Sequence, residues 1–363
     1  MSEVREITEY LRQTVELGGS DFHLSAWAPP AARVSGVLRP LEDFLLDPGT
    51  VARLIDDTLS EKQRAKLAED LELDYALQIE DVGRFRGNVH IVRGSPEAAF
   101  RHIPEEIPEL GTLGHHPVVD QICQLHRGLV LVTGITGSGK STTLASMIRR
   151  ISETRSGIIV TIEDPIEFLF SHNSCLVKQR EIGRDTRAFP IALRQALRQD
   201  PDVIVVSELR DLETIRIALT AAETGHLVLA TLHTLDAPQS IDRLIDVFPA
   251  DQQAQITTQL AGVLEAIVSQ RLMPRADGQG RVLASEVLRA NHGIRACIRD
   301  LKVEQLVGLM EIAHQDGNRT IDQSIAALLE NGVITREEAI AHARERRNFD
   351  QPEPPKKPKS IWT

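Results

Sequence analysis

The sequence predicts an α/β protein in which a small α+β domain precedes a larger domain built around a parallel sheet. Four short apolar runs stand out, at 129–132, 158–162, 203–206 and 227–230. They are continuous rather than alternating, as expected of strands that are covered on both faces. Helical patterns separate the runs, and polar residues follow each one. This is the pattern of a parallel α/β sheet with a ligand site at the carboxyl ends of its strands.

The first hundred residues carry shorter and more mixed patterns. Apolar residues at helical spacing predict a helix over 4–17, and a second helix is expected over 47–69. Short strands are expected at 22–24, 34–37, 73–79, 83–92 and 100–103. These elements predict an α+β domain over residues 1–103, followed by a linker with prolines and glycines over 104–117.

The second domain is placed at residues 118–349. Asp211 is an N-cap candidate for a helix that Gly225 ends, and another helix is predicted over 251–272. Residues 293–347 are expected to form a cluster of short helices. The last 14 residues, 350–363, form a tail of prolines and lysines that is too polar to fold alone and is expected to be disordered.

The composition excludes several classes of protein. Hydrophobic residues make up 42% of the chain and charged residues 26%, as in ordinary globular proteins. A net charge of −11 with only 4% aromatic residues argues against sequence-independent nucleic-acid binding. The three cysteines include no C-x-x-C pair, which argues against a structural zinc site. No apolar run approaches the ~20 residues of a membrane span, so we expect a cytosolic protein without direct membrane insertion.

The segment GITGSGKST at 134–142 matches the P-loop pattern, directly after an apolar run and before a helical pattern. Glycines let backbone N–H groups turn towards phosphate, and the helix N-terminus adds its positive dipole end. Lys140 supplies a full charge, and the Ser141 hydroxyl is placed to bind Mg²⁺. The alternative is a glycine-rich structural turn. The expected nucleotide-binding residues are Gly134, Thr136, Gly137, Ser138, Gly139, Lys140, Ser141 and Thr142.

Carboxylates follow two other apolar runs. Glu208 comes directly after VIVVS, where an acid can hold Mg²⁺ through water or orient the attacking water. Glu163 and Asp164 end the run before Pro165, where a carboxylate can act as general base. The structural alternatives are an N-cap or surface acid for Glu208 and a capped turn for the pair.

Histidines and arginines complete the set of candidates. His226 and His233 flank the fourth apolar run, and a histidine there could sense a γ-phosphate, although a lone histidine is more often a core residue. Arg84, Arg86 and Arg101 recur in the first domain. One or more could act as an arginine finger, with a solvated face as the alternative for any single one.

Several segments together resemble the secretion ATPase superfamily, and more narrowly the type IV pilus retraction ATPases of the PilT group. They are GITGSGKST, TIEDPIEF, DPDVIVVSELRDLETIRIALTAAETGHLVLATLHT and IDRLIDVFP, and the resemblance extends from about residue 19 to about residue 341. It implies a homohexameric motor that hydrolyses ATP with Mg²⁺ and powers pilus disassembly and twitching motility. It also implies a PAS-like N-terminal domain and a RecA-like ATPase domain.

The resemblance also implies roles for single residues. Segment 161–168 matches the Asp box with Glu163 as general base, and 207–211 matches Walker B with Glu208 as its acid. Segment 225–234 matches the His box with His226 and His233, and the three arginines lie in the region that supplies arginines to the nucleotide. The implied partners are the inner-membrane platform protein and the rest of the pilus machinery, with a paralogous motor as a further candidate. The implied location is cytoplasmic and peripheral at the inner membrane.

Two departures from the family pattern keep other functions open. Ser207 stands where Walker B normally carries glycine, and GIRACIRD at 293–300 replaces the signature AIRNLIRE while keeping Arg295 and Arg299. The alternatives are a PilU-like accessory motor and a nucleotide-binding regulatory subunit. A DNA-translocating RecA-like ATPase is disfavoured by the net charge.

Overall fold

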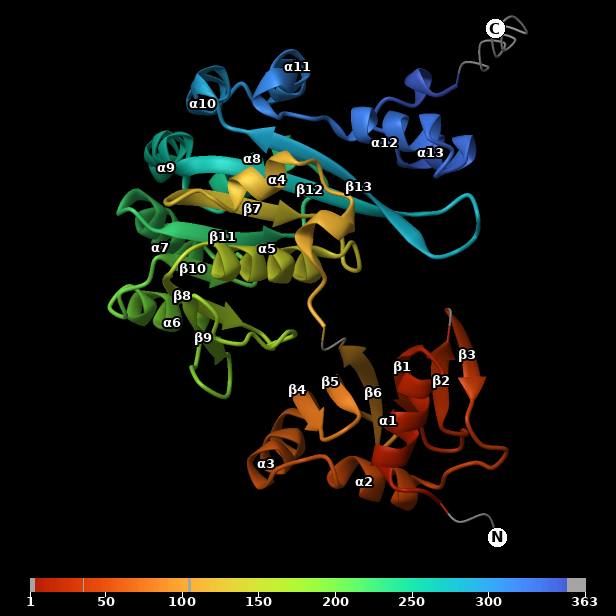
Figure 1. The fold of residues 1–363 in the computed structure, drawn as a ribbon. Coiled ribbons are helices and arrows are strands. Elements are labelled where there is room, and N and C mark those ends of the chain that lie inside the picture. Colours follow the sequence, from red (N-terminus) through yellow and green to blue (C-terminus); the bar gives the residue numbers. More distant parts are fainter. Residues whose placement is uncertain (1–3, 35, 104–105, 351–363) are drawn as a thin grey trace, which may run out of the picture. The chain divides into compact units, whose positions relative to one another are not determined.

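The computed structural model describes residues 4–34, 36–103 and 106–350, which lie in two compact units (Figure 1). The smaller unit comprises residues 1–107 together with 163–170, and the larger comprises 108–162 together with 171–363. The chain therefore passes from one unit to the other between Ile107 and Pro108, and the loop at 163–170 groups with the smaller unit. The predicted tail, apart from Asp350, is outside the described residues.

The smaller unit is an antiparallel sheet with helices, as predicted. Its described strands have the order β3-β2-β1-β6-β5-β4. Tyr10, Phe22, Phe85 and Phe100 are completely buried in its core, and the rings of Tyr10 and Phe22 stack 5.7 Å apart. The elements are α1 (Ile7–Glu16), β1 (Gly19–Leu24), β2 (Ala31–Val34), β3 (Val37–Pro40), α2 (Pro48–Asp56), α3 (Glu61–Asp70), β4 (Glu72–Ile79), β5 (Gly83–Val92) and β6 (Ser95–Ile103).

The single helix predicted over 47–69 is wrong, because the structure has two. Asp47 caps α2 by accepting from the backbone N–H groups of Gly49 and Thr50. Ser60 begins α3 with a capping box in which Gln63 accepts from the Ser60 backbone N–H at 2.8 Å. A serine with glutamine three residues later is a start signal, so the chain begins a new helix there rather than continuing the first.

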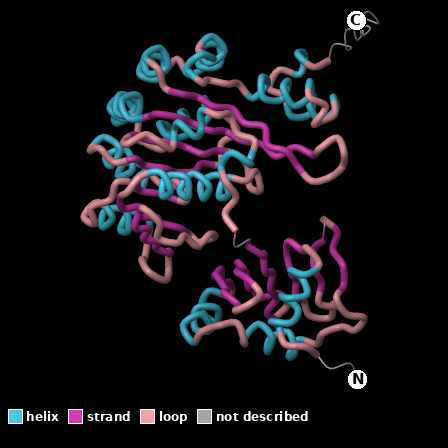
Figure 2. Tube along the Cα trace, in the orientation of Figure 1, coloured by secondary structure: helices cyan, strands magenta, loops and turns pink. Residues whose placement is uncertain are grey.

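The larger unit is built around a sheet of order β13-β12-β7-β11-β10-β8-β9. The four apolar runs form β7 (Gly128–Thr133), β8 (Gly157–Glu163), β10 (Val203–Val206) and β11 (Leu227–Leu232). Neighbours among these four are parallel, and every residue of β7, β10 and β11 is buried. The predicted parallel α/β architecture is thus confirmed, and Figure 2 shows its strands and helices in the larger unit.

Helices pack on the sheet and add a large shared core. The side chains of β7, β8, β10 and β11 that point to one face pack with residues of α6 to α10, and Leu219 and Leu260 are completely buried there. The helix α5 follows the loop after β7 and contacts β7, β9 and β11. These elements are α5 (Lys140–Thr154), β9 (Cys175–Glu181), α6 (Phe189–Ala196), α7 (Leu212–Glu223), α8 (Ala237–Asp246), α9 (Ala250–Val263) and α10 (His292–Arg299).

The helix predicted over 251–272 ends nine residues early, which is a second correction. The helix α9 stops at Val263, and β12 (Leu264–Pro274) follows at once, parallel to β7 and antiparallel to β13 (Arg281–Arg289). Leu264 and Ile267 are therefore strand residues, and both are completely buried. A continuous apolar run is compatible with a buried helix or a buried strand, and only its pairing with β7 decides between them.

The predicted cluster of short helices at 293–347 is confirmed. After α10 come α11 (Leu306–Ile312), α12 (Ile321–Glu330) and α13 (Arg336–His342), with short 3₁₀ turns between them. In Figure 1, α10 and α11 lie together near the end of β13, and α12 and α13 lie together near its beginning. Among the described residues, no helix is both long and apolar enough to cross a membrane.

Candidate nucleotide site

The carboxyl ends of four parallel strands gather most of the predicted site residues. Thr133 at the end of β7 lies opposite Leu232 of β11, and Val206 of β10 lies between Ala230 of β11 and Ile162 of β8. Gly134, His233 and Ser207 with Glu208 follow the ends of β7, β11 and β10, and Glu163 is the last residue of β8. They therefore follow one another along a single edge of the sheet, where ligands bind in open parallel sheets.

The loop from Gly134 to Gly139 has the backbone of a phosphate-binding turn. Gly134, Gly137 and Gly139 have φ of 146°, 78° and 89°, values that favour glycine. Lys140 is 9% exposed, and its ammonium donates to the carbonyl oxygens of Gly134 and Ile135 at 2.8 and 3.0 Å. The helix α5 begins at Lys140, so Ser141 and Thr142 lie in its first turn, where backbone N–H groups lack helical partners.

Glu208 is held by two basic side chains beyond the end of β10. Its Oε2 lies 2.8 Å from Arg210 Nη2 and 3.2 Å from His233 Nε2. Burial alone would raise the pKa of Glu208, but the hydrogen bond from Arg210 and the nearby charges outweigh it and leave that pKa below its ordinary value. Glu208 is therefore an ionised carboxylate at neutral pH, in contact with the histidine that follows the neighbouring strand.

The backbone at Ser207 is fixed on both sides. Its N–H donates to the Ile162 carbonyl of β8 at 2.9 Å, and its carbonyl accepts a hydrogen bond from the Thr231 hydroxyl of β11. The backbone N–H of Leu209 then donates to the Thr231 carbonyl at 3.1 Å. These bonds hold the turn that carries Glu208 against both neighbouring strands. They form with serine, rather than glycine, at the position before the acid.

His226 lies at the opposite end of β11 from His233. It precedes β11, its carbonyl accepts from the backbone N–H of Gly128, and Gly128 begins β7. Its ring Nδ1 is 2.9 Å from the Ala221 carbonyl at the end of α7. A parallel strand of six residues, at ~3.3 Å a residue, separates it from His233. The expected role of His226 at the nucleotide remains a prediction.

The three arginines and Glu163 belong to the smaller unit. Arg84 is 8% exposed and donates from Nε to the Ile166 carbonyl at 3.1 Å, within the loop that follows Glu163. Arg86 and Arg101 are opposite each other on β5 and β6. Arg86 Nε lies 3.8 Å from Asp74, and Arg101 Nε lies 2.9 Å from Asp21. The expected contacts of these arginines with nucleotide remain a prediction.

The structure adds site residues that sequence reasoning missed. Arg210 binds Glu208, as described above, and Gln270 of β12 donates to the Ser138 carbonyl at 2.7 Å. Arg210 carried a signal, because it is a second charge just after a buried strand. Gln270 stands in the apolar run AIVSQRLM, where the polar pair Ser269-Gln270 could have marked a strand end beside the loop.

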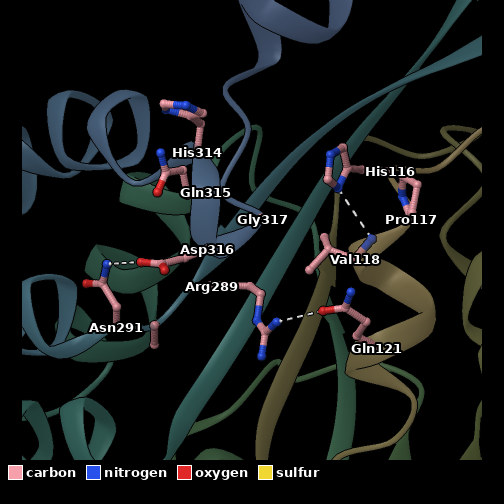
Figure 3. Close-up of a pocket in the computed structure, with 11 residues that line it drawn as sticks. His116, Pro117, Val118, Gln121, Arg289, Asn291, His314, Gln315, Asp316 and Gly317 are labelled. Atoms are coloured by element: carbon pink, nitrogen blue, oxygen red, sulfur yellow. Dashed lines mark hydrogen bonds between the residues drawn. The ribbon is translucent and has the colours of Figure 1, made fainter.

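The larger unit also has a polar cavity of about 450 Å³ that is lined by none of the predicted site residues. It lies between the start of α4 (Val118–Ile122), the end of β13 and the turn before Gly317. Figure 3 shows Arg289 reaching Gln121, with 3.1 Å between Nη1 and Oε1, and Asn291 reaching Asp316 at 2.9 Å. His116 and His314 also line the cavity.

The fold and the site together define a P-loop ATPase of the RecA-like kind. Residues 101–347 match the family model of the type II/IV secretion system proteins, and the chain belongs to that family. It is 45% identical to the type IV pilus retraction ATPase PilT of Pseudomonas aeruginosa. The match extends over 344 residues, which are 95% of this chain and the whole of the relative. The type IV pilus ATPase PilU of the same organism is 40% identical, over 93% of this chain and 88% of its own.

A solved structure of the same kind has the same fold. The crystal structure of the pilus retraction motor PilT with bound ADP matches with a TM-score of 0.88 and 48% identity, over 95% of this chain and 99% of that one. The ATPase DotB of Legionella pneumophila matches with a TM-score of 0.80 and 28% identity, over 94% and 98%. These likenesses confirm the resemblance to the retraction ATPase group that the sequence motifs indicated.

Proposed function

We propose that this chain is a motor that hydrolyses ATP to power type IV pilus retraction. One observation carries the chemistry: the P-loop, the ionised Glu208 and the His233 side chain that contacts it follow neighbouring strands at one edge of the sheet. Phosphoryl transfer needs mainly a positioned phosphate and compensation of its charge, and this edge offers a lysine, a helix N-terminus and a carboxylate. The 45% sequence identity to a retraction ATPase over 95% of the chain supports a role in pilus retraction.

The nucleotide is ATP, and the residues suit Mg²⁺ beside it. The Ser141 hydroxyl and the Glu208 carboxylate are oxygen donors, which Mg²⁺ prefers, and Mg²⁺ commonly binds through one or two such groups and the phosphates. The lowered pKa of Glu208 keeps its carboxylate charged for this purpose. Bound Mg²⁺ supplies charge compensation at the phosphates. We assign Glu163, at the end of β8, to orienting or deprotonating the attacking water.

Assembly and location extend the proposal. A ring of six subunits would let the arginines Arg84, Arg86 and Arg101 act on nucleotide, and the motor would work at the inner membrane through the platform protein of the pilus. A ring of six subunits has six times the mass of one chain, so light scattering can detect its formation. A second candidate is an accessory motor like PilU, to which the chain is 40% identical, and the altered signature at 293–300 favours this candidate.

The test compares ATP hydrolysis by the purified protein with pilus retraction in a deletion strain that carries this gene. Lys140→Ala and Glu208→Ala should each abolish hydrolysis and retraction, whereas Glu213→Ala, on the exposed side of α7, should leave both unchanged. Full turnover by Glu208→Ala would contradict the assignment of that acid. Hydrolysis by the wild type together with retraction that continues without the gene would shift the role to the accessory motor.

A further inference from the structure

Side chains donate hydrogen bonds to several carbonyl oxygens of the phosphate-binding loop. Lys140 binds those of Gly134 and Ile135, as described above. Gln270 Nε2 donates to the Ser138 carbonyl at 2.7 Å, and Arg281 Nη1 donates to the Gly137 carbonyl at 3.4 Å. Gln270 and Arg281 come from the β12–β13 hairpin, so this hairpin binds the Gly137–Ser138 and Ser138–Gly139 peptide groups.

The orientation of the Ser138–Gly139 peptide matters for anion binding. In a trans peptide the C=O and N–H bonds point in opposite directions. While Gln270 holds the Ser138 carbonyl towards β12, the N–H of Gly139 points away from β12. If this peptide rotated, a carbonyl dipole would face the phosphate instead of an N–H donor.

Gln270 is buried and packs tightly against the phosphate-binding loop. Its side chain is 1% exposed. A Cβ atom on Gly134 would lie 2.5 Å from the Gln270 carbonyl oxygen, and one on Gly139 would lie 3.2 Å from Gln270 Nε2. One residue earlier, the Thr133 hydroxyl donates to the Ser269 hydroxyl at 2.8 Å, which fixes β12 against β7 just before the loop.

The amide of Gln270 is only partly satisfied. Its Oε1 is buried and has no hydrogen-bond partner among the described residues. A buried acceptor without a partner costs stability, and an apolar side chain of the same length would remove that cost but would also remove the donor to the buried Ser138 carbonyl. The donor to Ser138 is therefore the contact of the Gln270 amide with an evident use.

We propose that Gln270 is a positioning residue that sets the affinity for nucleotide by holding the Ser138–Gly139 peptide with its N–H towards the phosphates. This inference rests on the proposed ATPase function and adds to it a residue from a strand outside the P-loop motif. Gln270 touches the loop and not the nucleotide, so it acts on binding more than on the chemical step.

The experiment replaces Gln270 by Met, which keeps the length and removes the donor, and by Glu, which places an acceptor against the Ser138 carbonyl. ADP binding is measured by calorimetry on the full chain, with KM and kcat for ATP and the unfolding temperature without nucleotide. Gln270→Met should raise the Kd for ADP and the KM for ATP by roughly 3- to 10-fold, the value of one hydrogen bond, with kcat within about two-fold. Gln270→Glu should raise both further.

The matched control is Gln259→Met on α9, whose side chain pairs with Glu223 at the surface and lies outside the loop. It should leave Kd, KM and kcat unchanged. Unchanged Kd and KM in both Gln270 variants, or a Kd that rises only as far as the folded fraction falls, would overturn the proposal. Failure of the wild type to bind ADP would instead contradict the ATPase function itself, so the two failures are distinguishable.

Discussion

A buried ion network joins the end of the described chain to the segment that follows His233, and its disruption gives a quantitative prediction. Arg344, just after α13, lies 2.8 Å from Asp236 and 3.6 Å from Glu286. Glu286 is completely buried on β13 and accepts from the backbone N–H of Ala237, while Asp236 caps α8. Arg344 thus compensates two carboxylates, one of which has no access to water.

The change Arg344→Met keeps the aliphatic part of the side chain and removes the charge. Removing one partner of a buried ion pair costs about 3–5 kcal/mol, because the remaining charge is uncompensated. Arg344 is itself partly exposed, with 21% of its side chain accessible, so we take the lower end, about 3 kcal/mol. For a unit of this size that lowers the unfolding temperature by roughly 6–12 °C, at about 2–4 °C per kcal/mol.

The loss should depend on pH in a defined direction. Burial raises the pKa of Glu286, and the charge of Arg344 works against that rise. A carboxyl whose folded pKa is raised contributes stability below its unfolded pKa and loses it as pH rises through the folded pKa. Removal of Arg344 raises the pKa of Glu286 further, so the destabilisation should be largest at pH 8 and smaller at pH 5, where Glu286 can take up a proton.

The assay is thermal and urea unfolding of Arg344→Met at pH 5 and pH 8, with Arg347→Met at an exposed position as the control. The double variant Glu286→Gln/Arg344→Met should recover part of the loss, because it leaves no buried charge at position 286. A loss equal to that of Arg347→Met, or one that grows as the pH falls, would refute the reasoning.

Three further predictions concern single side chains. Gly134→Ala should abolish ADP binding in calorimetry, because the added Cβ would lie 2.5 Å from both the Gln270 carbonyl oxygen and the Ser138 hydroxyl. The Cβ of Gly137→Ala meets no atom within 4 Å, so this variant should lose less ADP affinity. Equal losses of affinity in the two variants would contradict this explanation. Arg210→Ala should raise the pKa of Glu208, since burial then acts with less opposition, and move the acidic limb of the pH profile of kcat/KM to higher pH; an unmoved limb would show that Glu208 does not set it. Burial raises the pKa of Cys123 to about 12, so a thiol reagent at pH 8 should leave it unmodified in the folded protein and modify it after unfolding, as read by mass spectrometry.

The sequence by itself determined the elements whose chemistry is local. The four buried strands carry continuous apolar runs, and the P-loop is encoded in consecutive residues, so neither required knowledge of distant contacts. The same holds for Glu208, because a charge directly after a buried strand belongs at the carboxyl edge of a parallel sheet. The family motifs lie in the same short segments, which is why the resemblance to the retraction ATPases could be read from them.

Only the tertiary structure decided the features that depend on pairing between distant segments. It placed His226 at the amino end of β11 and His233 beside Glu208, because strand direction separates two residues that are close in sequence. It made residues 264–274 a strand rather than a helix, since that run pairs with β7. It also brought Gln270 beneath the P-loop, more than a hundred residues away along the chain. An apolar run specifies burial, but the partner that buries it is chosen by the whole sheet.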